Sequence, residues 1–160
     1  MRIIKLAFLS FLVFFGLILG MSLLIPSHIR ISKAINISQK KDSIFFLIAN
    51  RDQWPRWHPA FQVPNSDSLL KQNKISITQS VRTDSLITVN WQQQGKAPVR
   101  NSWQLHRVAA ADSVTLQWYM DFQLPWYPWQ KFSSLFYEKT YGTMMEQGLQ
   151  QIKNNVEKEQ

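Results

Sequence analysis

The chain has 160 residues and a formal net charge of +8, and 45% of its residues are hydrophobic and 13% aromatic. This length fits one folded domain, and seven Trp with ten Phe exclude a disordered chain. The absence of cysteine excludes disulfides, thiolate metal sites, a cysteine nucleophile and a lipid anchor on cysteine.

The N-terminal segment from Leu6 to Ile25 contains twenty residues without a charge, and Pro26 follows it. A helix of that length rises roughly 30 Å, about the thickness of the hydrocarbon core of a bilayer. We therefore predict that residues 1–26 form an uncleaved single-pass membrane anchor. Two alternatives stay open. One is a cleaved signal peptide, although its apolar region is typically only about 7–15 residues long. The other is a buried helix of a soluble protein.

The charges beside this segment give competing indications of topology. Arg2 and Lys5 favour a cytoplasmic N-terminus. Four basic residues between positions 30 and 41 instead favour a cytoplasmic location for the segment after the span. A short charged tail before an apolar run resembles a signal anchor, which favours a domain outside the cytoplasm. After residue 26, sixteen Lys and Arg face ten Asp and Glu, but the basic residues are dispersed. A nucleic-acid partner is therefore not expected, and the basic surface suits nearby anionic lipid.

The segment after the anchor begins with a predicted strand and a predicted helix. Isoleucines alternate with small or polar residues from Ile29 to Ile37, with one interruption at Lys33, as in a half-buried strand. Residues 41–50 carry apolar side chains on one helical face, and Asn50 can end that helix. The segment from Trp54 to Pro59 then breaks regular structure with two prolines.

The remaining sequence predicts a meander of strands and a long helix. Alternating patterns predict strands at residues 75–81, 87–91, 99–106 and 114–124, and the short polar turns between them indicate antiparallel pairing. On the last strand, parity places Trp118 on the apolar face and Asp121 on the opposite, water-facing side. A long helix is predicted from Lys131, with an apolar stripe that packs on the sheet: Phe132, Leu135, Phe136, Met144 or Met145, Leu149, Ile152 and Val156.

Three stretches resemble the START-like helix-grip superfamily, which is also described as the polyketide cyclase/dehydrase and lipid-transport group, SRPBCC. Ser32–Ile37 followed by Ile44 and Phe45 looks like the family's first strand entering its first helix. The segment Trp54–Pro59 is similar to a Trp-Pro-x-Trp-x-Pro motif, and Gly148–Lys153 with Glu157 is similar to a C-terminal Gly-Leu-x-x-Leu-Lys signature. The resemblance covers residues 28–158, and some bacterial members also carry an N-terminal membrane anchor.

The resemblance implies an α+β helix-grip fold for residues 27–160, in which a curved antiparallel sheet wraps a long C-terminal helix around an apolar cavity. Family members bind or transport hydrophobic ligands, and some are cyclases or dehydratases. Two features depart from the family pattern. Lys40 stands where members often have proline, and the middle of the sheet contains little glycine and looks compact.

No pattern in the sequence predicts a catalytic or metal site. The three histidines, His28, His58 and His106, have no metal-binding spacing, and carboxylates are few and scattered. His58 is interpreted as a histidine hydrogen-bonded in a turn, with a base at the mouth of a cavity as the alternative. No nucleophile motif, phosphate-binding loop or nucleotide fingerprint occurs, so we predict no catalytic residues and no cofactor.

The function predicted from the sequence is non-catalytic binding of a hydrophobic small molecule or lipid by a membrane-anchored monomer. A cyclase or hydratase, and a ligand-free interaction module of the cell envelope, are the alternatives. Pocket-lining aromatic and methionine side chains carry the prediction, although the same side chains could fill a core. Trp126, Tyr127 and Trp129 could pack normally or rest at a membrane interface. The predicted ligand-binding residues are Trp54, Trp57, Trp91, Trp103, Trp118, Met120, Phe122, Tyr141 and Met145.

Overall fold

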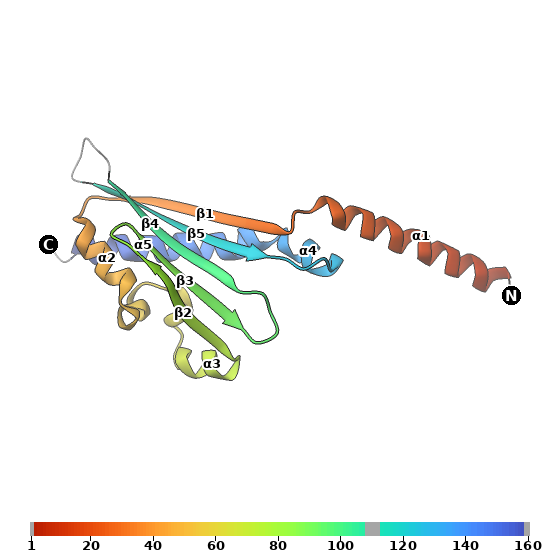
Figure 1. Ribbon diagram of the computed structural model, residues 1–160, viewed down its shortest axis with the longest axis horizontal. Coiled ribbons are helices and arrows are strands. Elements are labelled where there is room, and N and C mark those ends of the chain that lie inside the picture. Colours follow the sequence, from red (N-terminus) through yellow and green to blue (C-terminus); the bar gives the residue numbers. More distant parts are fainter. Residues whose placement is uncertain (1, 108–112, 159–160) are drawn as a thin grey trace.

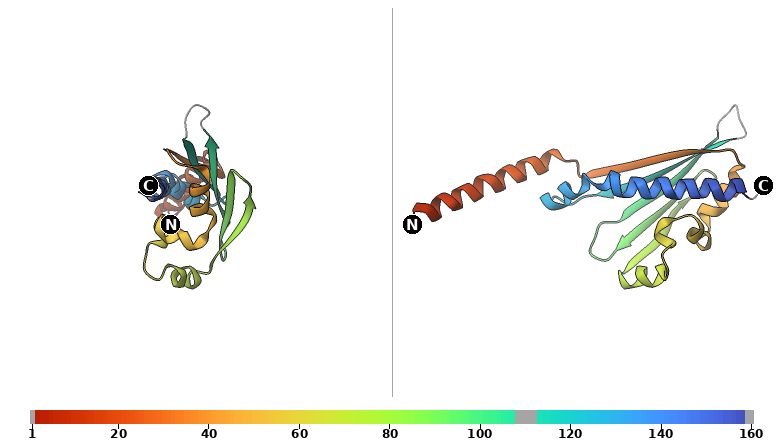
Figure 2. Two further views of the ribbon diagram at one scale, coloured as in Figure 1. Left: turned by 90° about the vertical axis from the view of Figure 1, so that its left-hand side faces the viewer. Right: turned by 180° about the vertical axis from the view of Figure 1, so that it is seen from behind.

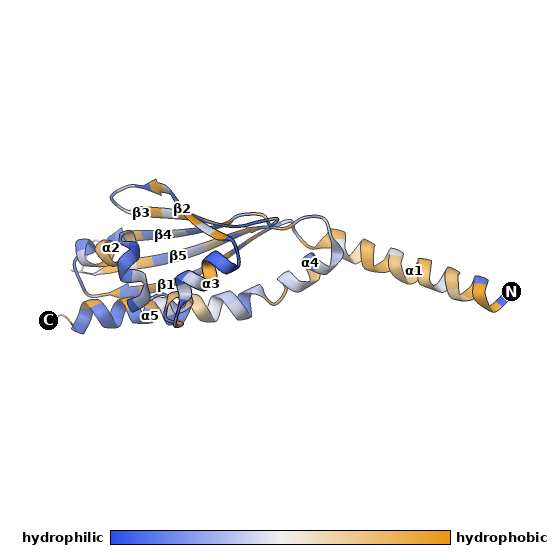
Figure 3. Ribbon diagram, turned by 90° about the horizontal axis from the view of Figure 1, so that it is seen from below, coloured by the Kyte–Doolittle hydropathy of each residue, from blue (hydrophilic) through white to orange (hydrophobic). Residues whose placement is uncertain are grey.

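The computed structural model describes residues 2–107 and 113–158. Helix α1 (Arg2–Leu24) projects away from the rest of the chain, and β1 begins a few residues after it (Figure 1). The remainder is an α+β structure in which one antiparallel sheet is packed against helices (Figure 2). Apolar residues dominate nearly the whole length of α1, whereas α5 is mostly polar along its visible surface (Figure 3).

The sheet has five strands in the order β1-β5-β4-β3-β2, and every neighbouring pair is antiparallel. Strands β2 to β5 follow one another as a meander, and β1 pairs along the full length of β5. The predicted strands and their antiparallel pairing are therefore confirmed. The bounds are β1 His28–Ile37, β2 Ile75–Arg82, β3 Leu86–Gln93, β4 Val99–Arg107 and β5 Val114–Gln123.

The alternation on β5 places its apolar side chains on the enclosed face of the sheet. Leu116 and Trp118 are fully buried there. Asp121 lies on the opposite face, as its parity predicts, but it is only 7% exposed, so the expectation that it faces water is wrong. The reason is Arg30 on the neighbouring strand, whose Nε and Nη2 donate to the two carboxylate oxygens of Asp121 at 2.6 and 3.0 Å. This bond also raises the pKa of the Arg30 guanidinium.

The connection between β1 and β2 is largely helical. It contains α2 (Lys41–Ala49), two 3₁₀ turns, η1 (Arg51–Arg56) and η2 (Pro59–Phe61), and the short helix α3 (Ser66–Gln72). Helix α2 confirms the predicted helix, and Asn50 ends it by donating its backbone N–H to the Phe46 carbonyl. Asn50 also begins η1, because its side chain accepts from the backbone N–H of Asp52 at 3.1 Å.

The C-terminal helix differs from the prediction of one continuous helix from Lys131. It consists of α4 (Pro128–Ser134), a π-helical turn η3 (Glu138–Gly142) and α5 (Thr143–Lys158). A π turn changes the helical phase, so the apolar positions before it do not continue the stripe of α5. Leu135 and Phe136 lie in the turn before η3 and are exposed, which corrects their predicted burial.

Helix α5 lies against the enclosed face of the sheet, and its predicted stripe of Met145, Leu149, Ile152 and Val156 is buried (Figure 2). Gly148 permits this close approach, since a Cβ at this position would lie 2.9 Å from Cζ3 of Trp118. On the neighbouring strand, Lys33 of β1 lies opposite Trp118 in the register and bridges Glu138 and Glu146, with both N–O distances at 2.8 Å. These two carboxylates raise the pKa of Lys33.

Candidate functional site

A cavity of about 940 Å³ lies between the sheet and the C-terminal helices. Its walls come from β3, β4 and β5, from the turn between β3 and β4, from the segment after β5, and from η3 and the start of α5. The lining residues are His58, Ala60, Ile75, Trp91, Gln93, Gly95, Lys96, Ala97, Pro98, Val99, Asn101, Met120, Phe122, Gln123, Leu124, Pro125, Tyr127, Gln130, Tyr137, Tyr141 and Met144.

Aromatic and methionine side chains form the wall of the cavity between β5 and η3. The ring of Phe122 lies 4.9 Å from that of Tyr137 and 4.8 Å from that of Tyr141, measured between centroids. Met120 and Met144 continue this wall from β5 and α5. Burial raises the pKa of the Tyr141 phenol, which keeps it neutral at pH 7. This part of the cavity therefore presents adaptable, uncharged, largely apolar surface.

A second part of the cavity, which we call the polar corner, is formed by His58, Trp91 and Asn101. The imidazole of His58 stacks on the indole of Trp91, with 5.3 Å between ring centroids. Nδ1 of His58 accepts from the backbone N–H of Ala60 at 3.2 Å. Burial lowers the pKa of His58 to about 3, so the ring is neutral at pH 7.

Behind the polar corner, four buried tryptophans form an aromatic core. The indole N–H groups of Trp54 and Trp57 donate to the carbonyls of Ile48 and Leu47, both at 2.9 Å. Carbonyls in the last turn of a helix lack intrahelical partners, so these two indoles complete the end of α2. The two tryptophans of the Trp54–Pro59 segment thus hold α2 against the sheet, where both contact Trp103.

The same core holds two tryptophans from the sheet. Trp103 and Trp118 lie opposite each other on β4 and β5, and their ring centroids are 5.2 Å apart. The N–H of Trp118 donates to Oδ1 of Asn101 at 3.1 Å. The core and the polar corner are therefore joined through one side-chain hydrogen bond.

The structure brings four of the nine predicted ligand-binding residues together on the cavity wall: Trp91, Met120, Phe122 and Tyr141. The other five lie in the packed core and outside the cavity lining: Trp54, Trp57, Trp103, Trp118 and Met145. Trp118 faces inward as predicted and contacts α5 at Gly148, but it does not line the cavity. The expectation that Trp118 borders a ligand therefore finds no support in the lining.

Sequence reasoning missed several lining residues, of which Asn101 and Tyr137 are the most informative. Asn101 shares the inward face of β4 with Val99, Trp103 and Leu105, and a polar residue within an apolar alternation was the available signal. Met144 belongs, like Met145, to the aromatic and methionine side chains that could line a pocket, and the structure places Met144 in the lining and Met145 in the core. The turn residues 95–98 carry no pattern that marks a cavity.

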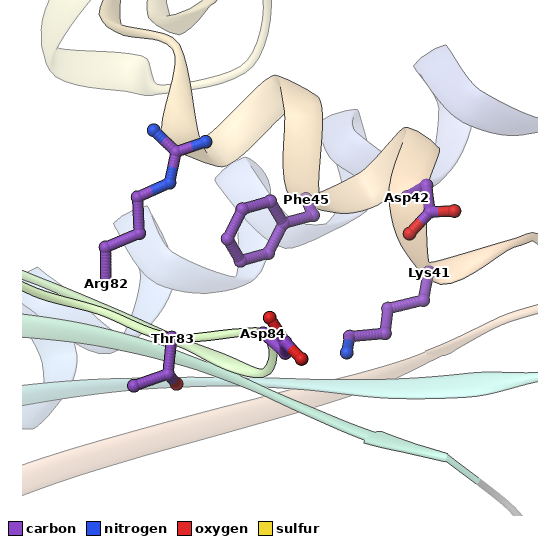
Figure 4. A pocket seen from close by; sticks show the side chains of 6 residues that line it. All are labelled: Lys41, Asp42, Phe45, Arg82, Thr83 and Asp84. Carbon is purple, nitrogen blue, oxygen red and sulfur yellow. The ribbon is translucent and has the colours of Figure 1, made fainter.

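A second cleft, of about 620 Å³, lies at the end of the molecule far from α1. Lys41, Asp42, Arg82 and Asp84 surround it, together with Thr83 and the ring of Phe45 (Figure 4). The guanidinium carbon of Arg82 lies 5.4 Å from the centre of that ring. This cleft is mainly charged, so it does not suit a hydrophobic ligand. Within residues 2–107 and 113–158, no group of three or more His, Asp or Glu side chains is arranged to hold a metal ion.

Comparisons with known proteins identify the fold. The sequence matches no protein-family model and no curated protein. Among solved structures, a START superfamily protein from Mycobacterium smegmatis superposes with a TM-score of 0.53 at 16% identity, over 82% of this chain and 99% of that one. The protein XoxI from Bacillus cereus superposes with a TM-score of 0.56 at 11% identity, over 79% and 94% of the two chains.

A third similar structure is the di-domain ARO/CYC protein StfQ from the steffimycin biosynthetic pathway, with a TM-score of 0.59 at 10% identity. The match covers 82% of this chain and 51% of StfQ, so this chain corresponds to about half of that protein. These similarities establish that the chain has the START-like helix-grip fold, as the resemblance in its sequence implied. A shared fold does not assign a function, which must be argued from the site.

Proposed function

We propose that residues 27–160 form a domain that binds a hydrophobic small molecule or lipid in the cavity between the sheet and the C-terminal helices. The observation that carries this proposal is the cavity itself: its volume of about 940 Å³ lies in the usual range for small-molecule sites, about 300–1,000 Å³. Its walls are mainly aromatic, aliphatic and methionine side chains with few polar groups, as in such sites.

The composition of the cavity wall supports binding without catalysis. Among the described residues that line it, there is no Ser, Thr, Asp or Glu, and Lys96 carries the only charge. His58 is neutral and its Nδ1 is already occupied by the backbone of Ala60. The hydroxyls among the described lining residues are the phenols of Tyr127, Tyr137 and Tyr141, and no hydrogen bond pairs one of them with a base, as nucleophilic or general acid–base catalysis would need. We assign the domain a binding role, as a monomer.

Residues 1–26 serve as the membrane anchor of this domain. Helix α1 has 23 residues and is long and apolar enough to cross a bilayer, and a signal sequence shares these properties. Its C-terminal end is attached to α4: Nζ of the buried Lys131 donates to the carbonyl of Ile25 at 2.8 Å. A cation at the C-terminal end of a helix is favourable. This contact joins the end of α1 to α4 and so holds the folded domain next to the proposed anchor.

The segment beside this attachment carries an exposed aromatic surface. Trp126 is 69% and Trp129 is 65% exposed. The Trp129 ring stacks on Tyr127 with 4.9 Å between centroids, and the Trp126 ring lies tilted against Tyr127 at 5.0 Å. Trp and Tyr are enriched at membrane interfaces. Because α4 contacts the end of α1, we assign this surface to the headgroup region of the bilayer that holds α1. Tyr127 also lines the cavity, so one end of the cavity would lie close to the lipid.

Ligand binding is tested with a matched pair of Val→Trp variants of the full chain. Val99 lines the cavity, whereas Val81 is exposed on β2 and lies outside the lining. Native mass spectrometry of protein released from micelles should show bound small molecules or lipids in the wild type and in Val81→Trp. Val99→Trp should lose most of this bound mass, because an indole fills part of the cavity. Equal occupancy in the two variants would contradict the proposed site.

The membrane assignment is tested by fluorescent labelling, which the absence of native cysteine makes specific. Trp129→Cys carries the label on the aromatic surface, and Ser43→Cys carries it on α2 at the opposite end of the domain (Figure 1). In nanodiscs, the label at position 129 should be quenched by lipids with a spin label near the headgroup, and the label at 43 only by aqueous quencher. Purely aqueous quenching at 129 would refute the assignment. A carbonate wash should leave the full-length chain in the membrane.

A further inference from the structure

Three polar atoms in the polar corner have no hydrogen-bond partner among the described residues. They are Nε2 of His58, Nε1 of Trp91 and Nδ2 of Asn101, and all three are shielded from solvent. Leaving such a group without a partner costs about 1–3 kcal/mol, so most buried polar groups are paired and each exception calls for an explanation. Three exceptions in one corner of a ligand-sized cavity point to a partner outside the chain.

The hydrogen bonds of His58 determine which of its nitrogens carries the proton. Nδ1 accepts from the backbone N–H of Ala60 at 3.2 Å, so it is the unprotonated nitrogen. A neutral imidazole has one donor and one acceptor, and the low pKa of about 3 keeps the ring neutral. Nε2 of His58 is therefore a hydrogen-bond donor.

The orientation of the Asn101 amide follows from its neighbour. An indole can only donate, and the N–H of Trp118 points to the Asn101 side chain at 3.1 Å. The amide oxygen must therefore face Trp118, which leaves the NH₂ group as the free end. The indole N–H of Trp91 is also a donor only. All three unpartnered atoms in the polar corner are donors, and none is an acceptor.

We propose that the polar corner recognises a neutral oxygen acceptor, such as a ketone or ester carbonyl, at one end of an otherwise apolar ligand. This inference rests on the proposed ligand-binding function and specifies the ligand's chemistry. A carbonyl oxygen has two lone pairs and can accept from more than one of these donors. A hydrocarbon at the same place would leave them unpaired, and sites built for hydrogen bonding discriminate strongly against such analogues.

The charges around the cavity favour a neutral acceptor over an ionised one. Among the described lining residues only Lys96 is charged, and it lies in the exposed turn between β3 and β4. His58 and Asn101, each 1% exposed, contribute no charge at pH 7. A carboxylate in the polar corner would be a buried anion without a cation, which is costly.

The test compares three probes of similar length, 2-heptadecanone, heptadecane and hexadecanoic acid, with the full-length chain in micelles. Indole N–H signals in ¹H–¹⁵N spectra are assigned with two variants, Trp91→Phe and Trp103→Phe. Trp103 is the matched control, because its Nε1 is also buried without a partner but it does not line the cavity. The ketone should move the Trp91 N–H signal downfield, leave Trp103 in place, and compete about tenfold better than the hydrocarbon.

The variants make the prediction quantitative. Trp91→Phe keeps an aromatic ring on His58 but removes one donor, so the preference for ketone over hydrocarbon should fall several-fold, whereas Trp103→Phe should keep it. Equal binding of ketone and heptadecane, with the Trp91 signal unmoved, would overturn the inference and leave ligand binding intact. It would indicate that the Trp91 N–H needs no ligand oxygen, for example because it points to the face of the Phe61 ring, which is nearly perpendicular to the indole at 5.7 Å. Preferential binding of the acid would overturn the inference that the polar corner recognises a neutral acceptor. Binding of no probe would overturn the inference together with the proposed function.

Discussion

Replacing Gly148 by alanine tests the packing that joins the C-terminal helix to the sheet. In an exposed helix this change would stabilise by about 1 kcal/mol. Here the new Cβ would lie 2.9 Å from Cζ3 of Trp118 and 3.3 Å from Cδ of Pro59. Neither group can move easily: the Trp118 ring lies 5.2 Å from that of Trp103 and 5.8 Å from that of Trp57, and its N–H is bonded to Asn101.

Inserting a methyl group into such a site costs about 1–3 kcal/mol, which outweighs the gain in helix propensity. The net of these two terms is a loss of up to about 2 kcal/mol, so we expect Gly148→Ala to lower the free energy of unfolding by up to that amount and the melting temperature by up to roughly 8 °C. Thermal unfolding of the full chain in micelles, followed by circular dichroism, measures the change.

Gly142 provides the matched control in the preceding turn. A Cβ at this position would lie 3.0 Å from Cε of Lys33 and 3.2 Å from Oε1 of Glu138, which are the ends of flexible side chains. These can shift by a few tenths of an ångström, so Gly142→Ala should stay within about 0.5 kcal/mol of the wild type or be more stable. If Gly148→Ala proved at least as stable as Gly142→Ala, the close contact between α5 and Trp118 would be refuted.

Two further predictions concern other buried groups. Leu149→Asp should prevent folding, because it puts an unpaired charge at a buried position of α5 and costs several kcal/mol. Gln150→Asp, at an exposed position, is its control. An unchanged melting temperature for Leu149→Asp would show that this face of α5 does not pack on the sheet. His58 should make stability pH-dependent, since its pKa falls from 6.5 to about 3 on folding. The unfolded chain then binds more protons, so this contribution is complete above pH 6.5 and is lost as the pH falls, by about 2 kcal/mol between pH 7 and 5. The glutamine variant His58→Gln should lack this slope, and an equal slope would show that His58 is not sealed from solvent.

The fold was predictable because local patterns and the resemblance agreed. Alternation identified the strands, and the face assigned to Trp118 follows from parity alone. The π turn η3 was not predictable, since no proline or glycine cluster marks its start and the apolar stripe continues through Leu135 and Phe136. Asp121 illustrates a different limit. Parity placed it on the correct face, but its burial depends on Arg30, which is 91 positions away in the chain.

The division of aromatic residues between core and cavity could not be read from the sequence. Trp91 and Trp103 both sit on inward faces of neighbouring strands, and both favour burial to the same degree. Only the tertiary arrangement separates them, because Trp103 lies opposite Trp118 and against Trp57, whereas Trp91 lies nearer the end of the sheet, opposite Val99. Met144 and Met145 differ in the same way by a rotation of one residue around α5.

Asn101 shows where a polar exception carries more information than the apolar pattern around it. On the inward face of β4, an amide between Val99 and Trp103 breaks an alternation that otherwise favours burial. A buried amide without partners costs free energy, so a residue at such a position needs a hydrogen-bond partner. Its oxygen has one in Trp118, and its NH₂ group has none among the described residues. The core therefore satisfies only the oxygen of this amide. The comparison of ketone and hydrocarbon probes tests whether a ligand oxygen accepts from its NH₂ group.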